Sequence, residues 1–168
     1  KNLFIFGPII FSNKFLNIDI LKNNILTFIA FCFISSTVYI MNDIVDVEND
    51  RKHPNKCKRP IASGKVSIPL AILIGIILCI TSLAIAFSLK FSILFIIIVY
   101  LINNIFYSFK IKNLVIIDVF SIALGFIFRV LAGSFATGVL ASDWIILCTL
   151  FLSLFLGFGK RRNEVIFL

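Results

Sequence analysis

The sequence predicts an all-α, polytopic transmembrane helical bundle. The chain has 168 residues, of which 60% are hydrophobic and only 14% are charged, and 20 of them are Phe. A soluble domain of this size does not need so much apolar side chain, and several apolar runs approach the roughly 20 residues that a helix needs to cross a membrane. The charged residues gather in short segments between these runs. We therefore expect an integral membrane protein surrounded by lipid.

Six apolar segments are expected to form helices in chain order. The first, at residues 3–11, is short, and residues 13–24 are polar enough to be a connection. The other five predicted helices span residues 25–41, 68–89, 91–109, 115–137 and 144–158. Pro69 is compatible with the first turn of its helix, where a backbone N–H is not needed. Residues 42–67 are predicted to form a long loop, because Pro and Gly interrupt them.

The long polar run at residues 39–64 contains a regular array of oxygen-bearing side chains. The array has N-D-x-x-D-x-x-x-D spacing and consists of Asn42, Asp43, Asp46 and Asp50. If the preceding helix continues through the array, a rotation of about 100° per residue places all four side chains on an arc of roughly 100°. Glu48 then lies on the other side of the helix. The spacing therefore predicts a strongly negative site on one helix face.

A negative array of this kind favours a bound cation. Two carboxylates this close repel by about 1 kcal/mol in water and by about 4 kcal/mol near a protein surface. Hard oxygen ligands suit Mg²⁺, which keeps several waters and shares its coordination shell with substrate phosphates. Basic side chains that follow the array are candidates for holding those phosphates: Arg51, Lys52, Lys56, Lys58 and Arg59. The alternative is a solvated loop of mixed charge, but it gives the acids on one arc no role.

The positive charges predict the orientation of the chain in the membrane. If residues 42–67 are cytoplasmic, eleven of the 16 Lys and Arg residues lie in cytoplasmic loops and three lie in the opposite loops. This is the positive-inside pattern. It places the acidic array and the basic clusters at residues 110–112 and 160–162 on one membrane face, as a single site requires. We assign the net charge of +8 to this topology and not to nucleic-acid binding.

Two charged residues interrupt the predicted helix at residues 115–137, namely Asp118 and Arg129. They are about three turns apart, so they share one helix face and are expected to point into the bundle. Arg129 is a candidate for contact with a phosphate, and Asp118 for orienting a basic group or a ligand hydroxyl. A structural ion pair with other helices explains them equally well. Asn103 and Asn104 are expected to form interhelical hydrogen bonds.

These residues resemble the UbiA-type prenyltransferase superfamily of intramembrane enzymes. The resemblance is carried by the acidic array, by the turn Arg59-Pro60-Ile61-Ala62-x-Gly64, and by Tyr107-Ser108 followed by Lys112. Within the superfamily the chain looks most like the polyprenyl-phosphate (decaprenyl-phosphate) 5-phosphoribosyltransferase branch, in segments such as DVENDRKHPNK, GFIFRVLAG and FGKRRNE. The resemblance implies a UbiA-like bundle of nine helices. Residues 1–168 would supply about six of them, as a single catalytic domain incomplete at both ends.

The resemblance also implies a reaction and its site. A 5-phosphoribosyl group would pass from phosphoribosyl diphosphate (PRPP) to a polyprenyl phosphate at the cytoplasmic face of a bacterial plasma membrane, and pyrophosphate would be released. The implied Mg²⁺ ligands are Asn42, Asp43, Asp46 and Asp50, and the three acids are the implied catalytic residues. The implied phosphate-binding residues are Arg51, Lys56, Arg59, Tyr107, Lys112, Asp118, Arg129, Lys160, Arg161 and Arg162.

Two other functions are weighed against this one. A UbiA-type enzyme that attaches a prenyl chain to an aromatic acceptor would carry a second acidic motif near the end of the last predicted helix. Residues 159–164 read Gly-Lys-Arg-Arg-Asn-Glu there, which favours a bare phosphate ligand. A transporter of a phosphorylated solute would show internal repeats, and we find none. One departure from the family pattern is Cys57, where a basic residue is expected.

Overall fold

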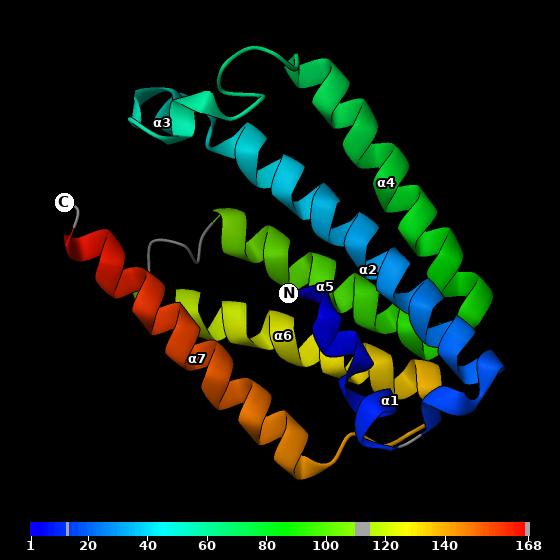
Figure 1. Cartoon of the computed structure of the whole chain (residues 1–168). Coiled ribbons are helices and arrows are strands. Elements are labelled where there is room, and N and C mark those ends of the chain that lie inside the picture. The colour runs from blue at the N-terminus through cyan, green and yellow to red at the C-terminus, as the bar shows by residue number, and fades with distance from the viewer. Residues whose placement is uncertain (13, 110–114, 167–168) are drawn as a thin grey trace.

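The computed structural model describes residues 1–12, 14–109 and 115–166, and these residues form helices and no strands. The all-α prediction is confirmed. Within the described ranges, four helices are long and apolar enough to cross a membrane: α2 (Ile18–Val45), α4 (Ile68–Leu89), α5 (Phe91–Phe109) and α6 (Val115–Thr137). Two shorter apolar stretches accompany them, one at Asn2–Phe11 and one at Asp143–Gly159 in α7 (Asp143–Ile166). The chain therefore forms the helical bundle of an integral membrane protein (Figure 1).

The N-terminal part of the chain contains more helix than the sequence suggested. Short helices η1 (Asn2–Phe6), α1 (Gly7–Phe11) and η2 (Lys14–Leu16) precede α2. The predicted connection at residues 13–24 is wrong for residues 18–24, which form the first turns of α2. Asn17 begins this helix, because its side-chain oxygen accepts hydrogen bonds from the next free backbone N–H groups at 3.1 and 3.2 Å. Polar side chains at a helix end therefore do not mark a loop here.

The acidic array lies on a helical path with one break. α2 extends to Val45, Asp46 leaves the helical conformation, and α3 (Val47–Lys52) follows at once. The backbone N–H of Asp46 still donates to the Asn42 carbonyl at 2.9 Å, and that of Asp50 donates to the Asp46 carbonyl at 2.8 Å. The first part of the predicted long loop is therefore helical. A further short helix, η3 (Lys56–Lys58), lies in the rest of that loop.

Helices α2 and α4 lie side by side along most of their lengths (Figure 1). Small side chains allow the close approach, and two hydrogen bonds cross the interface. The Ser82 hydroxyl donates to the Ala30 carbonyl at 2.8 Å, and the Thr37 hydroxyl donates to the Gly75 carbonyl at 3.2 Å. Such contacts stabilise helix pairs where lipid cannot satisfy polar groups.

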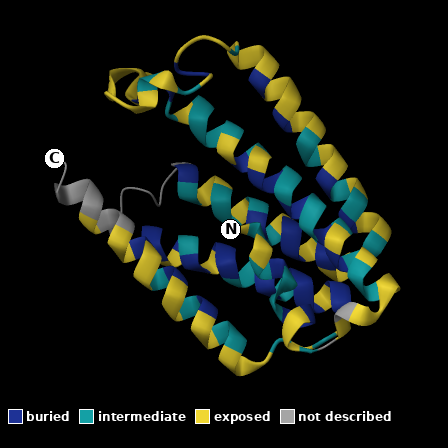
Figure 2. Cartoon of the chain, viewed as in Figure 1, coloured by how far each residue is buried: buried dark blue, intermediate teal, exposed yellow. Residues whose placement is uncertain are grey.

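The buried core lies between α2, α5, α6 and the N-terminal segment. Its fully buried members include Ile5, Phe31, Ile34, Ile93 and Ile97. Figure 2 shows that α4 and α7 expose much of their outer surface, and on α4 this surface consists of large apolar side chains. An apolar exterior of this kind is what a lipid-facing helix requires.

The connections place the polar segments at one end of the bundle. Helices α3 and η3 lie at the end where α2 finishes and α4 begins (Figure 1). At the opposite end, Lys90 joins α4 to α5, and its ammonium group donates to the Phe135 carbonyl in the last turn of α6 at 3.0 Å. This arrangement agrees with the alternation used to predict the topology. The basic cluster at residues 110–112 lies outside the described residues.

Gly133 in α6 is required for the close approach of the N-terminal segment. A Cβ atom at this position would lie 1.9 Å from the Ile5 carbonyl oxygen, so even Ala would displace the backbone of η1. We expect Gly133→Ala to lower the free energy of unfolding by roughly 2 kcal/mol, seen as a lower thermal midpoint in detergent. Gly75→Ala is the control, because its new Cβ would meet Ile40 at an ordinary 3.7 Å. Equal losses in both variants would contradict this packing.

Candidate active site

A cavity of about 660 Å³ opens between the end of α2, the segment around η3, and helices α5, α6 and α7. Eight of the predicted site residues line it: Asn42, Asp43, Asp46, Lys56, Arg59, Tyr107, Asp118 and Arg129. The fold therefore brings the acidic array, part of the basic run and both intramembrane charges to one space. These groups come from segments far apart in the sequence.

The carboxylates at one end of the cavity converge on a cation. The Nη1 atom of Arg59 donates to Asp43 Oδ1 and to Asp50 Oδ2, each at 2.8 Å. The Asp50 side chain is only 5% exposed, whereas those of Asp43 and Arg59 are 29% and 41% exposed. Asp50 therefore lies beneath Arg59, while Asp43 lies at the cavity wall. The guanidinium group occupies a position where the array favours positive charge.

The oxygen donors at this end are of the kind that Mg²⁺ uses. Asn42, Asp43 and Asp46 all line the cavity, and Mg²⁺ usually takes one or two carboxylates together with waters and substrate phosphates. In the described part of the chain, no three His, Cys, Asp or Glu side chains form a ready-made metal cluster. The donor set thus fits a metal ion that takes some of its ligands from the protein and the others from a substrate phosphate. The Asn42 side-chain oxygen also accepts a hydrogen bond from the Ser108 hydroxyl, which holds the amide toward α5.

Some predicted phosphate-binding residues lie elsewhere. Arg51 pairs with Glu48 at 3.1 Å and donates to the Ala62 carbonyl at 3.3 Å, so it ties α3 to the loop and does not line the cavity. Lys112 lies outside the described residues. Lys160 and Arg161 belong to α7, but their side chains lie outside the described part of the structure. Arg162 is exposed on the same helix.

Arg129 lies at the buried end of the cavity and is held by neutral oxygens. Its Nε donates to Asn2 Oδ1 at 2.8 Å, and its Nη2 donates to the hydroxyls of Ser35 and Tyr100, each at 3.1 Å. The Nη1 atom donates to the Gly125 carbonyl one turn earlier in α6. In the described ranges, every ion pair within 4 Å involves Arg51 or Arg59. Among the described residues, Arg129 therefore does not form the structural ion pair that was considered for it.

Several polar residues around the cavity are not among the predicted site residues. Tyr100, Asn104 and Ser108 on α5 line it, and Ser35 contacts it through Arg129. Asn104 was expected to bond across helices, but its amide donates to the Tyr100 carbonyl of its own helix at 2.7 Å. The prediction for Asn103 is confirmed, since its amide donates to the Ser121 carbonyl on α6 at 3.3 Å. The signal for these residues was their polarity within apolar helices.

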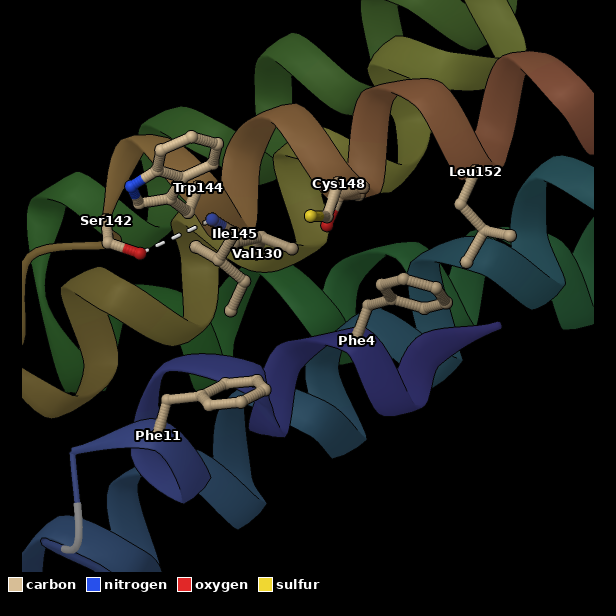
Figure 3. Close-up of a pocket in the computed structure, with 10 residues that line it drawn as sticks. Phe4, Phe11, Val130, Ser142, Trp144, Ile145, Cys148 and Leu152 are labelled. Carbon is tan, nitrogen blue, oxygen red and sulfur yellow. Dashed lines mark hydrogen bonds between the residues drawn. The ribbon is translucent and has the colours of Figure 1, made fainter.

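A second cavity, of about 410 Å³, is almost entirely apolar and lies between the N-terminal segment and α7 (Figure 3). Phe4 and Phe11 line it from the N-terminal side, and Trp144, Cys148 and Leu152 line it from α7. The Phe4 ring also packs edge-on against Phe126, with ring centroids 5.1 Å apart. Because Phe126 lines the polar cavity, this ring pair lies at the boundary between the two cavities.

Comparisons with known proteins agree with this architecture. Residues 6–161 match the UbiA prenyltransferase family. A decaprenyl-phosphate phosphoribosyltransferase of Mycobacterium tuberculosis is 36% identical over 148 residues, which is 88% of this chain and 49% of the relative. The protein of the same name from Corynebacterium glutamicum is 36% identical over 143 residues, which is 84% of this chain and 43% of the relative. The chain therefore spans about half the length of these curated relatives.

The fold is similar to that of a solved membrane protein. A structure described as digeranylgeranylglyceryl phosphate synthase in membranes superposes with a TM-score of 0.74 and 28% sequence identity. The match covers 94% of this chain and 54% of the solved chain.

Proposed function

Because this chain belongs to the UbiA prenyltransferase family, we propose that the protein containing it transfers a 5-phosphoribosyl group from PRPP to a polyprenyl phosphate and releases pyrophosphate. One observation carries this assignment: the cavity has carboxylates and Arg59 at one end and the buried Arg129 at the other. It thus offers separate places for a metal-bound diphosphate and for a second anion. The relatives that carry the name decaprenyl-phosphate phosphoribosyltransferase support the choice of reaction.

Asp43 and Asp46, with Asn42 beside them, are the proposed Mg²⁺ ligands. Asp50 belongs to the same site through its contact with Arg59. The metal would neutralise the charge of the leaving diphosphate. Lys56 and Arg59 line the cavity next to the carboxylates and are suited to donate hydrogen bonds to phosphate oxygens. Tyr107 and Asp118 are assigned to substrate contacts in the same cavity.

The chemistry requires little from protein acids and bases. An oxygen of the lipid phosphate forms a bond to C1 of the ribose, and the C1–O bond to the diphosphate breaks with its electron pair leaving on the diphosphate. C1 acquires oxocarbenium character on the way, as in glycosyl transfer generally. The attacking phosphate is already ionised and needs no general base. His53 fits this account, because its Nδ1 accepts the backbone N–H groups of Asn55 and Lys56 at 3.2 and 3.3 Å.

The polar end of the cavity is assigned to the cytoplasmic face. The support is the distribution of Lys and Arg between the two sets of loops and the position of α3 and η3 at one end of the bundle (Figure 1). PRPP, which is water-soluble, would enter from this face. Lys112, Lys160, Arg161 and Arg162 are assigned to the same face by this topology and remain candidates for contacts with its phosphates.

Prenyl transfer is the second candidate function, because the solved structure with a similar fold is that of digeranylgeranylglyceryl phosphate synthase. Family members that use a prenyl diphosphate are expected to carry a second acidic motif near the end of α7. The sequence has Lys160-Arg161-Arg162 in that place. This exchange of acids for cations favours phosphoribosyl transfer.

The proposed function is tested by following label from PRPP into lipid. The protein containing this chain, in nanodiscs with polyprenyl phosphate and Mg²⁺, is expected to move labelled phosphoribose into the organic phase. Chelation with EDTA should reduce this transfer at least about tenfold, because the diphosphate then leaves without its counter-charge, and added Mg²⁺ should restore it. Consumption of a labelled prenyl diphosphate, with no transfer from PRPP, would replace this function with prenyl transfer.

A further inference from the structure

We propose that the buried end of the polar cavity binds the phosphate of the lipid acceptor, and that Ser35 and Tyr100 position Arg129 for this contact. The inference rests on the proposed function and assigns one of its two anionic substrates to one end of the cavity. PRPP is then left to the end that carries Asp43, Asp46 and Arg59.

The buried end contains a charge that the helix packing alone does not explain. Arg129 is 5% exposed, and the two hydroxyl residues that hold it, Tyr100 and Ser35, are 5% and 4% exposed. Burying a cationic side chain inside a membrane bundle costs free energy, so such residues usually bind a ligand or pair with an acidic side chain. All hydrogen-bond acceptors of Arg129 in the described ranges are neutral oxygens. The positive charge is therefore oriented by its neighbours without being neutralised by a hydrogen-bonded carboxylate.

The hydrogen bonds of Arg129 leave donors for a ligand. A guanidinium group has five N–H donors. Four are used, one on Nε with Asn2, two on Nη2 with Ser35 and Tyr100, and one on Nη1 with Gly125. The second N–H of Nη1 has no acceptor among the described residues. The Tyr100 hydroxyl accepts from Arg129, lines the cavity and lies 3.4 Å from the Ser35 hydroxyl. When Ser35 is the donor in that contact, the Tyr100 hydroxyl proton is a second donor for a ligand.

The surroundings of Arg129 favour an anion with an apolar body. Its guanidinium carbon lies 4.9 Å from the Tyr100 ring centroid and 5.9 Å from those of Phe31 and Phe126. Few polar partners are available in such an environment for the ribose hydroxyls and three phosphorus centres of PRPP, and burying polar groups without partners is costly. A lipid phosphate presents a single charged group. The Arg129 guanidinium would offset part of its negative charge in a low-dielectric site.

The second cavity shows where the tail of such a lipid would lie. Val130 follows Arg129 directly in α6 and lines the apolar cavity of Figure 3. The Phe4–Phe126 ring pair lies at the boundary between the two cavities. A phosphate at Arg129 therefore has an apolar space beside it on one side and the acid-lined space on the other. An acceptor that joins a phosphate to a hydrocarbon chain would place its phosphate at Arg129 and its chain in the apolar cavity.

The positioning role is tested by separating the two KM values. In the protein containing this chain, Ser35→Ala is expected to raise the KM for polyprenyl phosphate about tenfold, the effect of losing one hydrogen bond to a charged group. The KM for PRPP should stay within about twofold. Ser35→Thr keeps the hydroxyl and should restore the wild-type KM. Ser36→Ala is the matched control, because Ser36 is exposed and its hydroxyl donates to the Cys32 carbonyl of its own helix.

The possible outcomes separate this inference from the function on which it rests. A rise in the KM for PRPP alone, or an equal rise in both KM values, would overturn the assignment while transfer by the wild type upholds the proposed function. Direct binding of geranyl phosphate provides a second readout if the wild type makes no product. Arg129→Lys and Tyr100→Phe should both weaken that binding, and unchanged binding in variants with a wild-type thermal midpoint would also overturn the assignment.

Discussion

Replacing Asp43 with Asn is expected to slow phosphoribosyl transfer by about 100-fold or more, the scale seen when a metal site is disturbed. Asp43 lines the cavity at the end of α2, where Asp46 and Asn42 lie beside it. The substitution keeps the size of the side chain and removes one negative charge. The loss should therefore appear as a weaker response to Mg²⁺, and higher Mg²⁺ concentrations should recover part of the rate. The transfer rate and its dependence on Mg²⁺ concentration are both measured by running the labelled-PRPP assay as an Mg²⁺ titration.

Glu48→Gln is the matched control for this variant. Glu48 lies in the same acidic segment, but its side chain is 74% exposed and pairs with Arg51 away from the cavity. Its neutralisation changes the total charge as much as Asp43→Asn does, so a general electrostatic effect would slow both variants. We expect Glu48→Gln to retain the wild-type rate and Mg²⁺ dependence. Equal losses in the two variants would show that the acidic array does not act through the cavity.

Much of the fold was predictable because a helix that crosses a membrane needs a long apolar run, which is easy to recognise in a sequence. Apolar length alone predicted α4, α5 and α6, and their observed bounds match the expected ones. The prediction failed at residues 18–24, where an Asn cap begins a helix in a polar segment. The predicted loop was also wrong for its first residues after Asn42, where the helix assumed for the acidic array does continue, with a break at Asp46. In both segments, short-range backbone and capping hydrogen bonds determine that the chain is helical. The apolar pattern of the sequence does not reveal these bonds.

The site was predictable only where its residues are close in sequence. The spacing of the acidic array predicted a shared negative site for a metal ion, which stays a prediction. In the structure, Asp43 and Asp50 of the array instead bind the Arg59 guanidinium. The same spacing could not show that Asp50 lies beneath Arg59. The residues around Arg129 come from the N-terminal segment, α2 and α5, and each is a single polar side chain in an apolar run. Their meeting depends on helix packing, so their role emerges only with Asn2, Ser35 and Tyr100 in place.

Replacing Arg59 with Gln is expected to lower the free energy of unfolding by roughly 2 kcal/mol, because the buried Asp50 carboxylate loses its half-exposed cationic partner. Asp50 is 5% exposed at its side chain, and Arg59 is its hydrogen-bonded cation at 2.8 Å. Without the guanidinium group, the buried carboxylate loses that partner. The measurement is the thermal midpoint of the purified protein in detergent without divalent ions. Arg51→Gln is the control, since an exposed pair contributes less than about 1 kcal/mol.

Two further variants show whether this loss arises from the ion pair. Arg59→Gln combined with Asp50→Asn should recover most of the stability, because the double variant leaves no buried charge without a partner. Added Mg²⁺ should raise the thermal midpoint of Arg59→Gln more than that of the wild type, since Asp43 is then released from Arg59 and faces the cavity. If Arg51→Gln were as destabilising as Arg59→Gln, the contact between Arg59 and Asp50 would contribute no more to stability than an exposed ion pair does. An unchanged response to Mg²⁺ would mean that the guanidinium and the metal do not compete for the same carboxylates.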